Sequence, residues 1–280
     1  MKIEIYYNML KLFDLHNDYF LKFNSAKKID KYITKISKPA DSIVSAIWTS
    51  ELNVEESMSE IERARDYLNK FPSVFLGVED LHFLSTQNID KFLSFKPLYA
   101  GLTWNTCNCL AGGAHESGRI TNFGKTTIKL LEKNNIYVDS AHLNEQSFMD
   151  LSKISEKPLL CSHTAFYGVN ENKRNLKDYQ LKMIVDSGGL VGLCLVSEFL
   201  CGSNNSTIDD VVKHIDYFAC KFGINNLAIG TDFYGTKHLP KGIQTYKALC
   251  EKVSGKLKDL GYTEKGINKI FYENAENYFF

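Results

Sequence analysis

The chain has 280 residues, of which 44% are hydrophobic and 24% are charged, as is usual for a globular protein. Lysine plus arginine and aspartate plus glutamate number 33 each, so the chain lacks the basic surplus that marks most nucleic-acid-binding proteins. No stretch approaches the ~18 apolar residues of a membrane span, and no basic amphipathic segment suggests binding at a membrane surface.

The seven cysteines are irregularly spaced and odd in number, whereas a secreted disulfide framework normally has an even number. Cys107 and Cys109 form a lone Cys-x-Cys, which is weak evidence for a metal site and is better explained as two loop residues. Residues 1–8 lack the apolar run and small-residue cleavage site of a secretory signal. We therefore expect reduced thiols in a cytoplasmic protein.

Eight short apolar runs, rich in β-branched and aromatic residues, recur along the chain. Several are continuous and do not alternate with polar residues, which is typical of strands buried on both faces of a parallel sheet. In chain order the expected strands are Leu12–Leu15, Ile43–Trp48, Val74–Val78, Leu98–Thr103, Ile136–Val138, Leu159–Ser162, Leu190–Leu195 and Leu227–Gly230.

Helical patterns lie between these runs. Asp178 is expected to cap one helix, Asp209 to lie in the first turn of another, and Gly188-Gly189 to end a helix before the seventh strand. The clearest expected helices are Glu56–Asn69, Lys125–Asn134, Asp178–Ser187, Ile208–Phe222 and Tyr246–Leu260.

Eight strands that alternate with helices predict an α/β fold of the (β/α)8 TIM-barrel type. No linker rich in Pro, Gly or Ser divides the chain, so we expect one domain over residues 1–280. A doubly wound open sheet is the alternative, but it would normally carry a glycine-rich phosphate loop after the first strand. Here the first strand runs into His16-Asn17-Asp18, which contains no glycine.

Side chains of metal-binding type stand where five of the expected strands end. In a (β/α)8 barrel all strand carboxyl ends open on one face, so these side chains should converge on one pocket. Each alone could be a helix cap or a structural residue, but their joint occurrence favours a metal site. They are His16 and Asp18 at the first strand, Glu79 at the third, His142 at the fifth, His163 at the sixth and Asp232 at the eighth.

Imidazole and carboxylate without thiolate suit Zn²⁺, with Mn²⁺ or Fe²⁺ as alternatives. A catalytic zinc usually keeps three protein ligands, so five ligands are too many for one ion. Two ions about 3.5–4 Å apart, bridged by one carboxylate, would use them all and activate a water as nucleophile. Asp232 is then expected to move the proton of that water.

The remaining histidines, which lie in expected loops or helices, serve as a comparison. They are His82, His115, His214 and His238. We expect surface or structural roles for all four, and His82 and His115 are the best placed to line the mouth of the pocket.

Taken together, the motifs resemble those of the membrane dipeptidase (renal dipeptidase) family of zinc peptidases over nearly the whole chain. The order and the spacing of the motifs both agree with the family. The matching segments are Asp14-Leu15-His16-Asn17-Asp18, Gly77-Val78-Glu79, Leu102-Thr103-Trp104-Asn105, Asn122-Phe123-Gly124-Lys125, Val138-Asp139-Ser140-Ala141-His142, Ser162-His163, Lys173-Arg174-Asn175 and Gly230-Thr231-Asp232-Phe233.

The resemblance implies a (β/α)8 barrel with two zinc ions and a role for each matching residue. His16 and Asp18 correspond to ligands of the first zinc, Glu79 to the bridging carboxylate, and His142 and His163 to ligands of the second zinc. Asp232 stands where the family keeps its acid/base aspartate. Arg174 stands where the family binds the terminal carboxylate of the substrate, for which a guanidinium fork is well shaped.

The sequence also departs from the family pattern. Trp104 stands where many members have a histidine that polarises the scissile carbonyl, and a tryptophan N–H can donate one hydrogen bond but carries no charge. Asp80 stands where glycine is usual, and Tyr234 replaces a frequent aspartate. These changes bear on substrate range and turnover more than on metal binding.

The function expected from the site and the resemblance is metal-dependent hydrolysis of small dipeptides. Trp104 and Arg174 are expected to contact the substrate, and a C-terminal D-residue would be in keeping with the family. Two alternatives stay open: a barrel metallohydrolase acting on another small amide, lactone or ester, and a non-catalytic binding protein. Relatives are often dimers, so the resemblance also raises the prospect of a homodimer.

Overall fold

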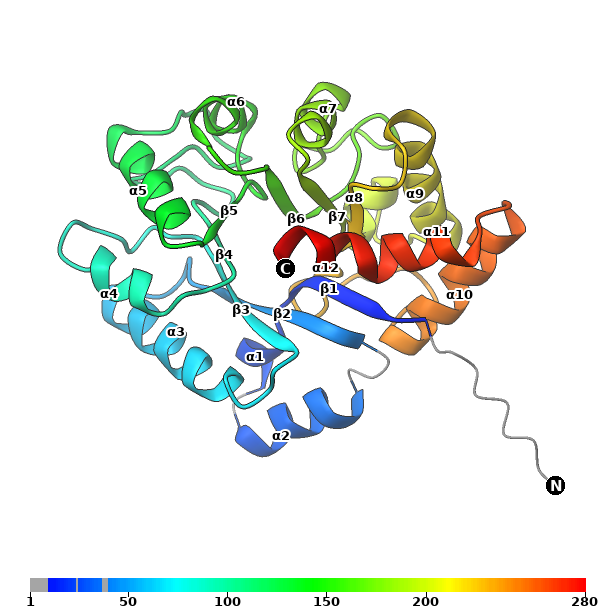
Figure 1. The fold of residues 1–280 in the computed structure, drawn as a ribbon, viewed down its shortest axis with the longest axis horizontal. Helices are drawn as coiled ribbons and strands as arrows, with labels where there is room; N and C mark the ends of the chain where they lie inside the picture. Colours follow the sequence, from blue (N-terminus) through cyan, green and yellow to red (C-terminus); the bar gives the residue numbers. More distant parts are fainter. Residues whose placement is uncertain (1–9, 24, 37–39) are drawn as a thin grey trace.

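The structure, a computed structural model, describes residues 10–23, 25–36 and 40–280. Eight parallel strands close into a barrel in sequence order, and β8 pairs with β1 through Ile229 and Asp14 (Figure 1). The expected (β/α)8 barrel is therefore confirmed. The strands are β1 (Leu12–Asn17), β2 (Ala40–Trp48), β3 (Val74–Glu79), β4 (Tyr99–Gly101), β5 (Tyr137–Asp139), β6 (Leu160–Thr164), β7 (Leu190–Leu193) and β8 (Leu227–Ile229).

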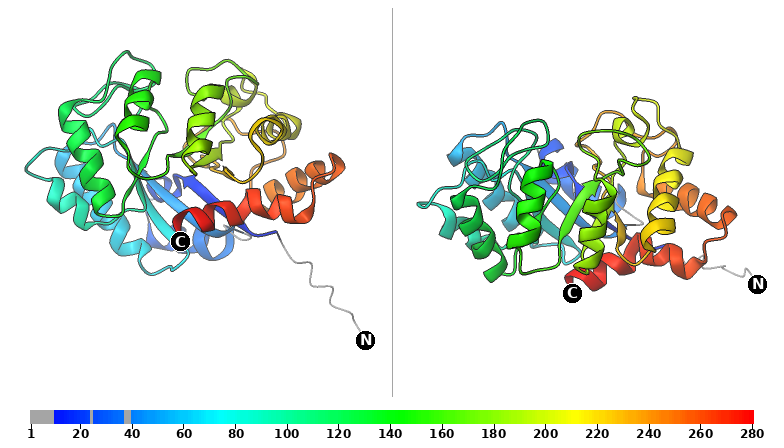
Figure 2. Two further views of the ribbon diagram at one scale, coloured as in Figure 1. Left: turned by 45° about the horizontal axis from the view of Figure 1, so that its top comes forward. Right: turned by 90° about the horizontal axis from the view of Figure 1, so that it is seen from above.

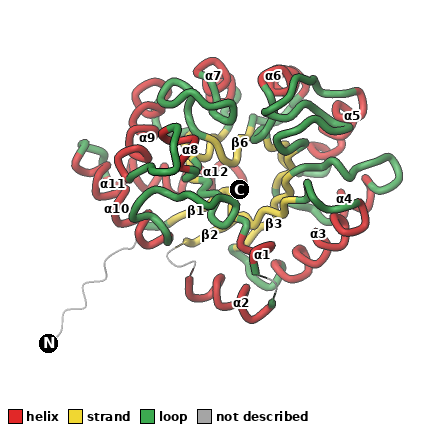
Figure 3. Tube along the Cα trace, turned by 180° about the vertical axis from the view of Figure 1, so that it is seen from behind, coloured by secondary structure: helices red, strands yellow, loops and turns green. Residues whose placement is uncertain are grey.

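Helices form the outer layer around the strands (Figure 3). After β1 come α1 (Tyr19–Lys22), α2 (Ala26–Lys31) and the π-helical segment η1 (Tyr32–Ile36). The helices α3 (Val54–Leu68), α4 (Ile89–Ser94), α5 (Asn122–Lys133), α6 (Glu145–Ile154) and α7 (Asp178–Asp186) follow β2 to β6 in turn. After β7 come α8 (Ser197–Cys201) and α9 (Ile208–Phe222), and after β8 come α10 (Tyr246–Asp259), α11 (Glu264–Asn268), η2 (Lys269–Glu273) and α12 (Asn274–Phe279).

One prediction about the helix ends is wrong. Asp178 does not cap α7 but is its first residue, because Lys177 takes the extended backbone of the cap position. The Asp178 carboxylate instead accepts a hydrogen bond from Tyr217 of α9 at 2.6 Å. Asp209 lies in the first turn of α9, and Gly188 follows the end of α7 with φ +73°, both as predicted.

The inside of the barrel is filled from the amino ends of the strands. Phe13 near the start of β1 packs against Phe279 of α12, and Tyr137 at the start of β5 packs against Phe279 and Tyr278. The C-terminal helices therefore run across this end of the barrel (Figure 2). Because the C-terminal helices cover the amino end, a site can form at the opposite, open end, where the strands finish.

The N-terminal prediction falls on residues 1–8, which lie outside the described residues. Among the residues that are described, none of the helices has the length and apolar character needed to cross a bilayer. All seven cysteines carry free thiols, and Cys107 and Cys109 are exposed.

His214 of α9 is a structural histidine, as expected. Its side chain is fully buried, its Nδ1 accepts a hydrogen bond from the backbone N–H of Phe166, and its Nε2 donates to the carbonyl of Leu200 at 3.0 Å. These contacts tie α9 to the loops after β6 and β7. Burial lowers the pKa of His214 from 6.5 to about 4, so the ring is neutral in the folded protein.

We predict that His214 contributes to acid sensitivity. Below pH 6.5 the imidazole of His214 binds a proton in the unfolded chain, but in the folded chain it stays neutral down to about pH 4. The unfolding free energy is therefore unaffected by protonation of His214 above pH 6.5 and falls as the pH is lowered from 6.5 toward 4. His214→Gln should therefore reduce the loss of unfolding free energy over that interval by about 3 kcal/mol. Denaturant titrations at several pH values measure this. His238→Gln, at an exposed histidine, should keep the wild-type dependence, and an equal dependence in both variants would contradict the assignment.

Candidate metal centre

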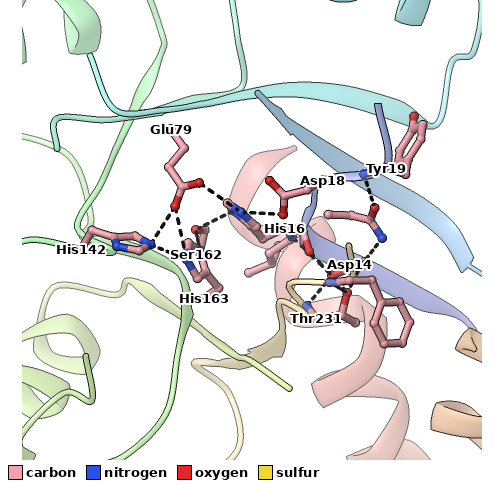
Figure 4. A network of polar contacts seen from close by, with 12 residues as sticks. Asp14, His16, Asp18, Tyr19, Glu79, His142, Ser162, His163 and Thr231 are labelled. Atoms are coloured by element: carbon pink, nitrogen blue, oxygen red, sulfur yellow. Dashed lines mark hydrogen bonds and ion pairs between the residues drawn. The ribbon is translucent and has the colours of Figure 1, made fainter. Parts of the chain in front are cut away.

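The structure brings together the six metal-binding side chains expected from the sequence, all at the open face of the barrel. Their ligand atoms form two overlapping groups, in each of which all atoms lie within 4.8 Å of one another. One group is His16, Glu79 and His163, and the other is His16, Asp18 and Asp232. His142 joins the first group through contacts with Glu79 and His163 (Figure 4).

The carboxylate of Glu79 lies between the two halves of this cluster. Its Oε1 is 2.7 Å from Nε2 of His142 and 3.6 Å from Nε2 of His163. Its Oε2 faces the other way and lies 3.9 Å from Nε2 of His16. Each oxygen therefore meets a different set of imidazoles, which is the arrangement that a carboxylate bridging two cations requires.

Each of the three imidazoles is oriented by a hydrogen bond at its other ring nitrogen. Nδ1 of His16 lies 2.9 Å from the hydroxyl of Tyr99, and that hydroxyl itself donates to the carbonyl of Leu15. The Tyr99 oxygen is thus left to accept from Nδ1–H. This fixes the tautomer of His16 and leaves the lone pair of Nε2 facing the cluster.

The two other imidazoles follow the same pattern. Nδ1 of His142 lies 2.9 Å from Oδ1 of Asn105, a pure acceptor. Nδ1 of His163 lies 2.9 Å from Oγ of Ser162, which donates its own proton to Asp139. Both rings therefore present unprotonated Nε2 atoms, and these two atoms are only 3.0 Å apart. Two lone pairs at that separation suit a shared cation.

The second half of the cluster also has unsatisfied ligand atoms. Oδ2 of Asp18 lies 3.5 Å from Nε2 of His16, and both atoms are buried without a hydrogen-bond partner among the described residues. The loop after β8 approaches so closely that a Cβ at Gly235 would lie 2.1 Å from Oδ1 of Asp232. Buried polar atoms are rarely left unpaired, so the donor set fits a bound cation.

The pKa values of the paired imidazoles favour metal binding. Burial and the positive charge of Arg174 lower the pKa of His142 to about 4. Burial, together with the neighbouring imidazoles, lowers the pKa of His163 well below 6.5. Both rings are therefore neutral at physiological pH, which is the form that ligates a metal.

The carboxylates create an excess of negative charge. Burial opposes protonation of His16, but Asp18 and Glu79 outweigh it and raise the pKa of His16 to about 10. Burial and the charge of Asp18 raise the pKa of Asp232 well above its usual range. Protons on His16 and Asp232 thus offset part of the negative charge of the carboxylates, which a divalent cation would neutralise more completely.

The backbone is strained where the ligands leave the strands. His142 and Asp232, each three residues beyond a strand, have φ values of +66° and +57°. Left-handed backbone is uncommon outside glycine and concentrates at functional sites. Both residues place their side chains in the cluster.

A second layer of hydrogen bonds holds β1 against β8 beneath the cluster. The buried carboxylate of Asp14 accepts from the backbone N–H of Thr231 at 2.7 Å, from its hydroxyl at 2.6 Å and from the hydroxyl of Tyr246 at 2.5 Å. These bonds link the strand that carries His16 to the turn that carries Asp232 (Figure 4).

Arg174 and Trp104 line a cavity of about 770 Å³ above the cluster. Arg174 is 5% exposed, its Nη2 donates to the carbonyl of His163 at 3.4 Å, and its Nε has no partner among the described residues. His115, for which a surface or structural role was expected, also lines this cavity. His82 instead bonds the carbonyl of Leu52 through Nε2.

The chain matches the model of the membrane dipeptidase family (peptidase family M19) over residues 42–277. The chain belongs to this family. The resemblance seen in the motifs is therefore confirmed, and with it metal-dependent hydrolysis of dipeptides as the class of activity.

The chain is also similar to individual proteins and to solved structures. An uncharacterised protein from the pqqA 5′ region of Klebsiella pneumoniae is 28% identical over 232 residues, which cover 78% of this chain and 84% of that protein. An uncharacterised dipeptidase of Schizosaccharomyces pombe is 28% identical over 183 residues, 61% of this chain and 44% of that protein. A metallopeptidase structure from Rhodobacter sphaeroides, liganded with a phosphinate mimic of L-Ala-D-Ala, shares the fold with TM-score 0.83, 19% identity and coverage of 97% and 99% of the two chains.

No role was assigned from the sequence to several residues of this membrane dipeptidase family member. Asn105 and Ser162 were named only as parts of matching segments or expected strands, and Tyr99 was not named at all, yet all three orient imidazoles. Tyr99 acts on a residue 83 positions away, and no local pattern indicates such a partner. Trp48, the last residue of β2, lines the cavity, and its only signal was an aromatic residue at a strand end.

Asp80 stands where the family usually has glycine. Its φ of +69° is the left-handed backbone that glycine adopts most readily. Its carboxylate accepts from Ser50 at 2.6 Å, from Asn108 at 2.9 Å and from the backbone N–H of His82 at 3.1 Å. The side chain thus joins the loops after β2, β3 and β4 directly behind Glu79.

We predict an order of stability among Asp80 variants. Asp80→Ala should lower the unfolding free energy by about 3 kcal/mol, because it leaves buried donors without an acceptor while it keeps a Cβ in left-handed backbone. Asp80→Gly should cost about 1 kcal/mol less than alanine, although it removes more atoms, because glycine tolerates positive φ. Denaturant unfolding measures both. A glycine variant less stable than the alanine variant would contradict the role of backbone strain.

Proposed function

We propose that this chain hydrolyses the peptide bond of dipeptides at a binuclear zinc centre in the barrel mouth. The observation that carries the proposal is the position of Glu79, whose two carboxylate oxygens face separate sets of imidazole Nε2 atoms. A mononuclear site would need only one of these sets.

In this proposal His16 and Asp18 hold the first ion, His142 and His163 hold the second, and Glu79 contacts both. Bound zinc would polarise the scissile carbonyl and lower the pKa of the attacking water. Hydrogen bonds from Nδ1 keep the imidazoles in the correct tautomer, so ligand geometry is set before the substrate arrives.

Asp232 is proposed as the group that moves the proton. Its carboxylate belongs to the group of ligand atoms around His16 and Asp18 and is held there by the turn that ends at Gly235. From this position it would take a proton from the attacking water and deliver it to the leaving amine. Water and dipeptide are then converted into two free amino acids.

Arg174 is proposed to bind the terminal carboxylate of the dipeptide. It is a buried guanidinium whose Nε lacks a partner among the described residues, and it lines the cavity above Glu79. A buried cation with a free donor is suited to a carboxylate. Trp104 would contact the substrate in place of the usual histidine, leaving the charged stabilisation of the carbonyl oxygen to the metal ions and Arg174.

The proposal has four further parts: zinc as the metal, a cytoplasmic location, one domain over residues 1–280 and a homodimer. The choice of zinc is supported by a ligand set of imidazole and carboxylate. The location is supported by the seven free thiols.

We predict that Glu79→Ala abolishes both properties of the site. Loss of the bridge should reduce bound zinc from two ions per chain to one or fewer and lower kcat/KM by more than about 100-fold, since even outer-shell changes cost about 10–100-fold. Metal analysis and hydrolysis of an L-Ala-D-Ala and L-Ala-L-Ala panel measure the two effects. Glu251→Ala, at an exposed glutamate of α10, is the matched control. Full activity in a metal-depleted Glu79→Ala protein would refute the proposal.

We predict that Arg174→Ala acts mainly through KM. Removing one partner of a buried charge pair costs at least about 2 kcal/mol, so the KM for free dipeptides should rise about 30-fold or more. Dipeptide amides, which lack the terminal carboxylate, should be affected much less. Steady-state kinetics on both substrate sets decide the matter: equal losses would remove Arg174 from carboxylate binding, and esters or lactones cleaved far faster than any dipeptide would favour another hydrolase.

A further inference from the structure

The two tryptophans of the chain lie against each other at the rim of the site. Trp48 is the last residue of β2 and Trp104 follows β4, and their rings meet edge to face with centroids 5.3 Å apart. Trp48 pairs in register with Glu79, while the ring of Trp104 lies 5.9 Å from that of His142. The pair therefore brackets the end of β3, where the proposed bridging carboxylate stands.

The proposed carboxylate-binding group lies on the other side of the barrel mouth. The Arg174 guanidinium packs 5.4 Å from the ring centroid of Phe199, in α8 after β7. In a closed barrel of eight strands in sequence order, β7 is diametrically opposite β3. Arg174 and the tryptophan pair thus face each other across the metal ligands, and all three side chains line the same cavity.

This opposition orients the substrate. A dipeptide whose terminal carboxylate is held by Arg174 has its scissile bond over the metal ligands, so its N-terminal residue must lie on the β3 side. We propose that Trp48 and Trp104 bind the side chain of that residue and select for a large apolar one, aromatic above all. The inference rests on the proposed dipeptidase function and adds the substrate class.

The chemistry of the cavity wall supports this choice. Two indole rings offer a wide apolar surface with edges and faces that suit aromatic packing. Val196 and Phe199, in the segment after β7, line the cavity on the arginine side, and Leu21 after β1 and Tyr234 after β8 line it elsewhere. A bulky N-terminal residue therefore meets the tryptophans, whereas a bulky C-terminal residue meets Phe199.

The test is a kinetic panel in which only the N-terminal residue changes. With L- or D-alanine as the second residue, wild-type kcat/KM should rise from Gly through Ala and Leu to Phe, by about tenfold or more between Ala and Phe. Trp48→Ala and Trp104→Ala should each reduce this ratio severalfold, and Trp48→Phe should restore most of it. Phe199→Ala should leave the ratio unchanged and alter preference at the second residue instead.

A binding experiment checks the same contact without turnover. Because the pair contains every tryptophan in the chain, fluorescence excited where tyrosine does not absorb reports on these two rings alone. A phosphinate mimic of L-Phe-D-Ala should bind about tenfold more tightly than that of L-Ala-D-Ala and change the emission more strongly.

The outcomes separate the two proposals. Dipeptides cleaved with no N-terminal preference, or with a preference that survives both alanine substitutions, would overturn the role of the tryptophans while leaving the dipeptidase function intact. A Phe mimic that binds without changing the emission would do the same. Failure of every dipeptide to be cleaved or bound would overturn the proposed function and this inference with it.

Discussion

The carboxylate of Glu79 stands between two sets of imidazole nitrogen atoms, and the surrounding structure keeps it charged there. Burial alone would raise the pKa of this carboxyl, but the positive charges of His16 and Arg174 outweigh burial and hold it below its usual range. The imidazoles can face it because their Nδ1 atoms are engaged elsewhere, by Tyr99 among others. The barrel thus supplies a charged carboxylate together with imidazole nitrogen atoms on either side of it, which suits a pair of cations.

This arrangement requires left-handed backbone in the loops of the site. It also depends on tight packing beneath the site and at the opposite end of the barrel. Left-handed backbone occurs at His142 and Asp232, whose side chains belong to the cluster, and at Asp80, whose side chain lies behind Glu79. Such conformations persist only when their surroundings determine them strongly. Here the Asp14 network joins β1 to β8 beneath the site, and the C-terminal helices fill the amino end of the barrel, around Phe13 and Tyr137.

Much of this was predictable because it depends on short-range patterns. Continuous apolar runs indicate strands buried on both faces. Because all strands of the barrel end on one face, the sequence alone predicted that His16, Glu79 and His163 lie close together. Long-range contacts were not predictable in this way. Nothing local tells that Tyr99 orients His16, or that a tryptophan at the end of β2 lies at a cavity and not in the core. Asp178 was misplaced because capping depends on one residue of backbone conformation, which Lys177 adopts instead.

Anomalous diffraction at the zinc absorption edge can show whether the Glu79 carboxylate bridges two metal ions. Crystals of zinc-loaded protein should show two peaks about 3.5–4 Å apart, one beside His16 and Asp18 and one beside His142 and His163, each within bonding distance of a different Glu79 oxygen. A single peak, or two peaks of which neither contacts Glu79, would rule out a bridging role for this carboxylate.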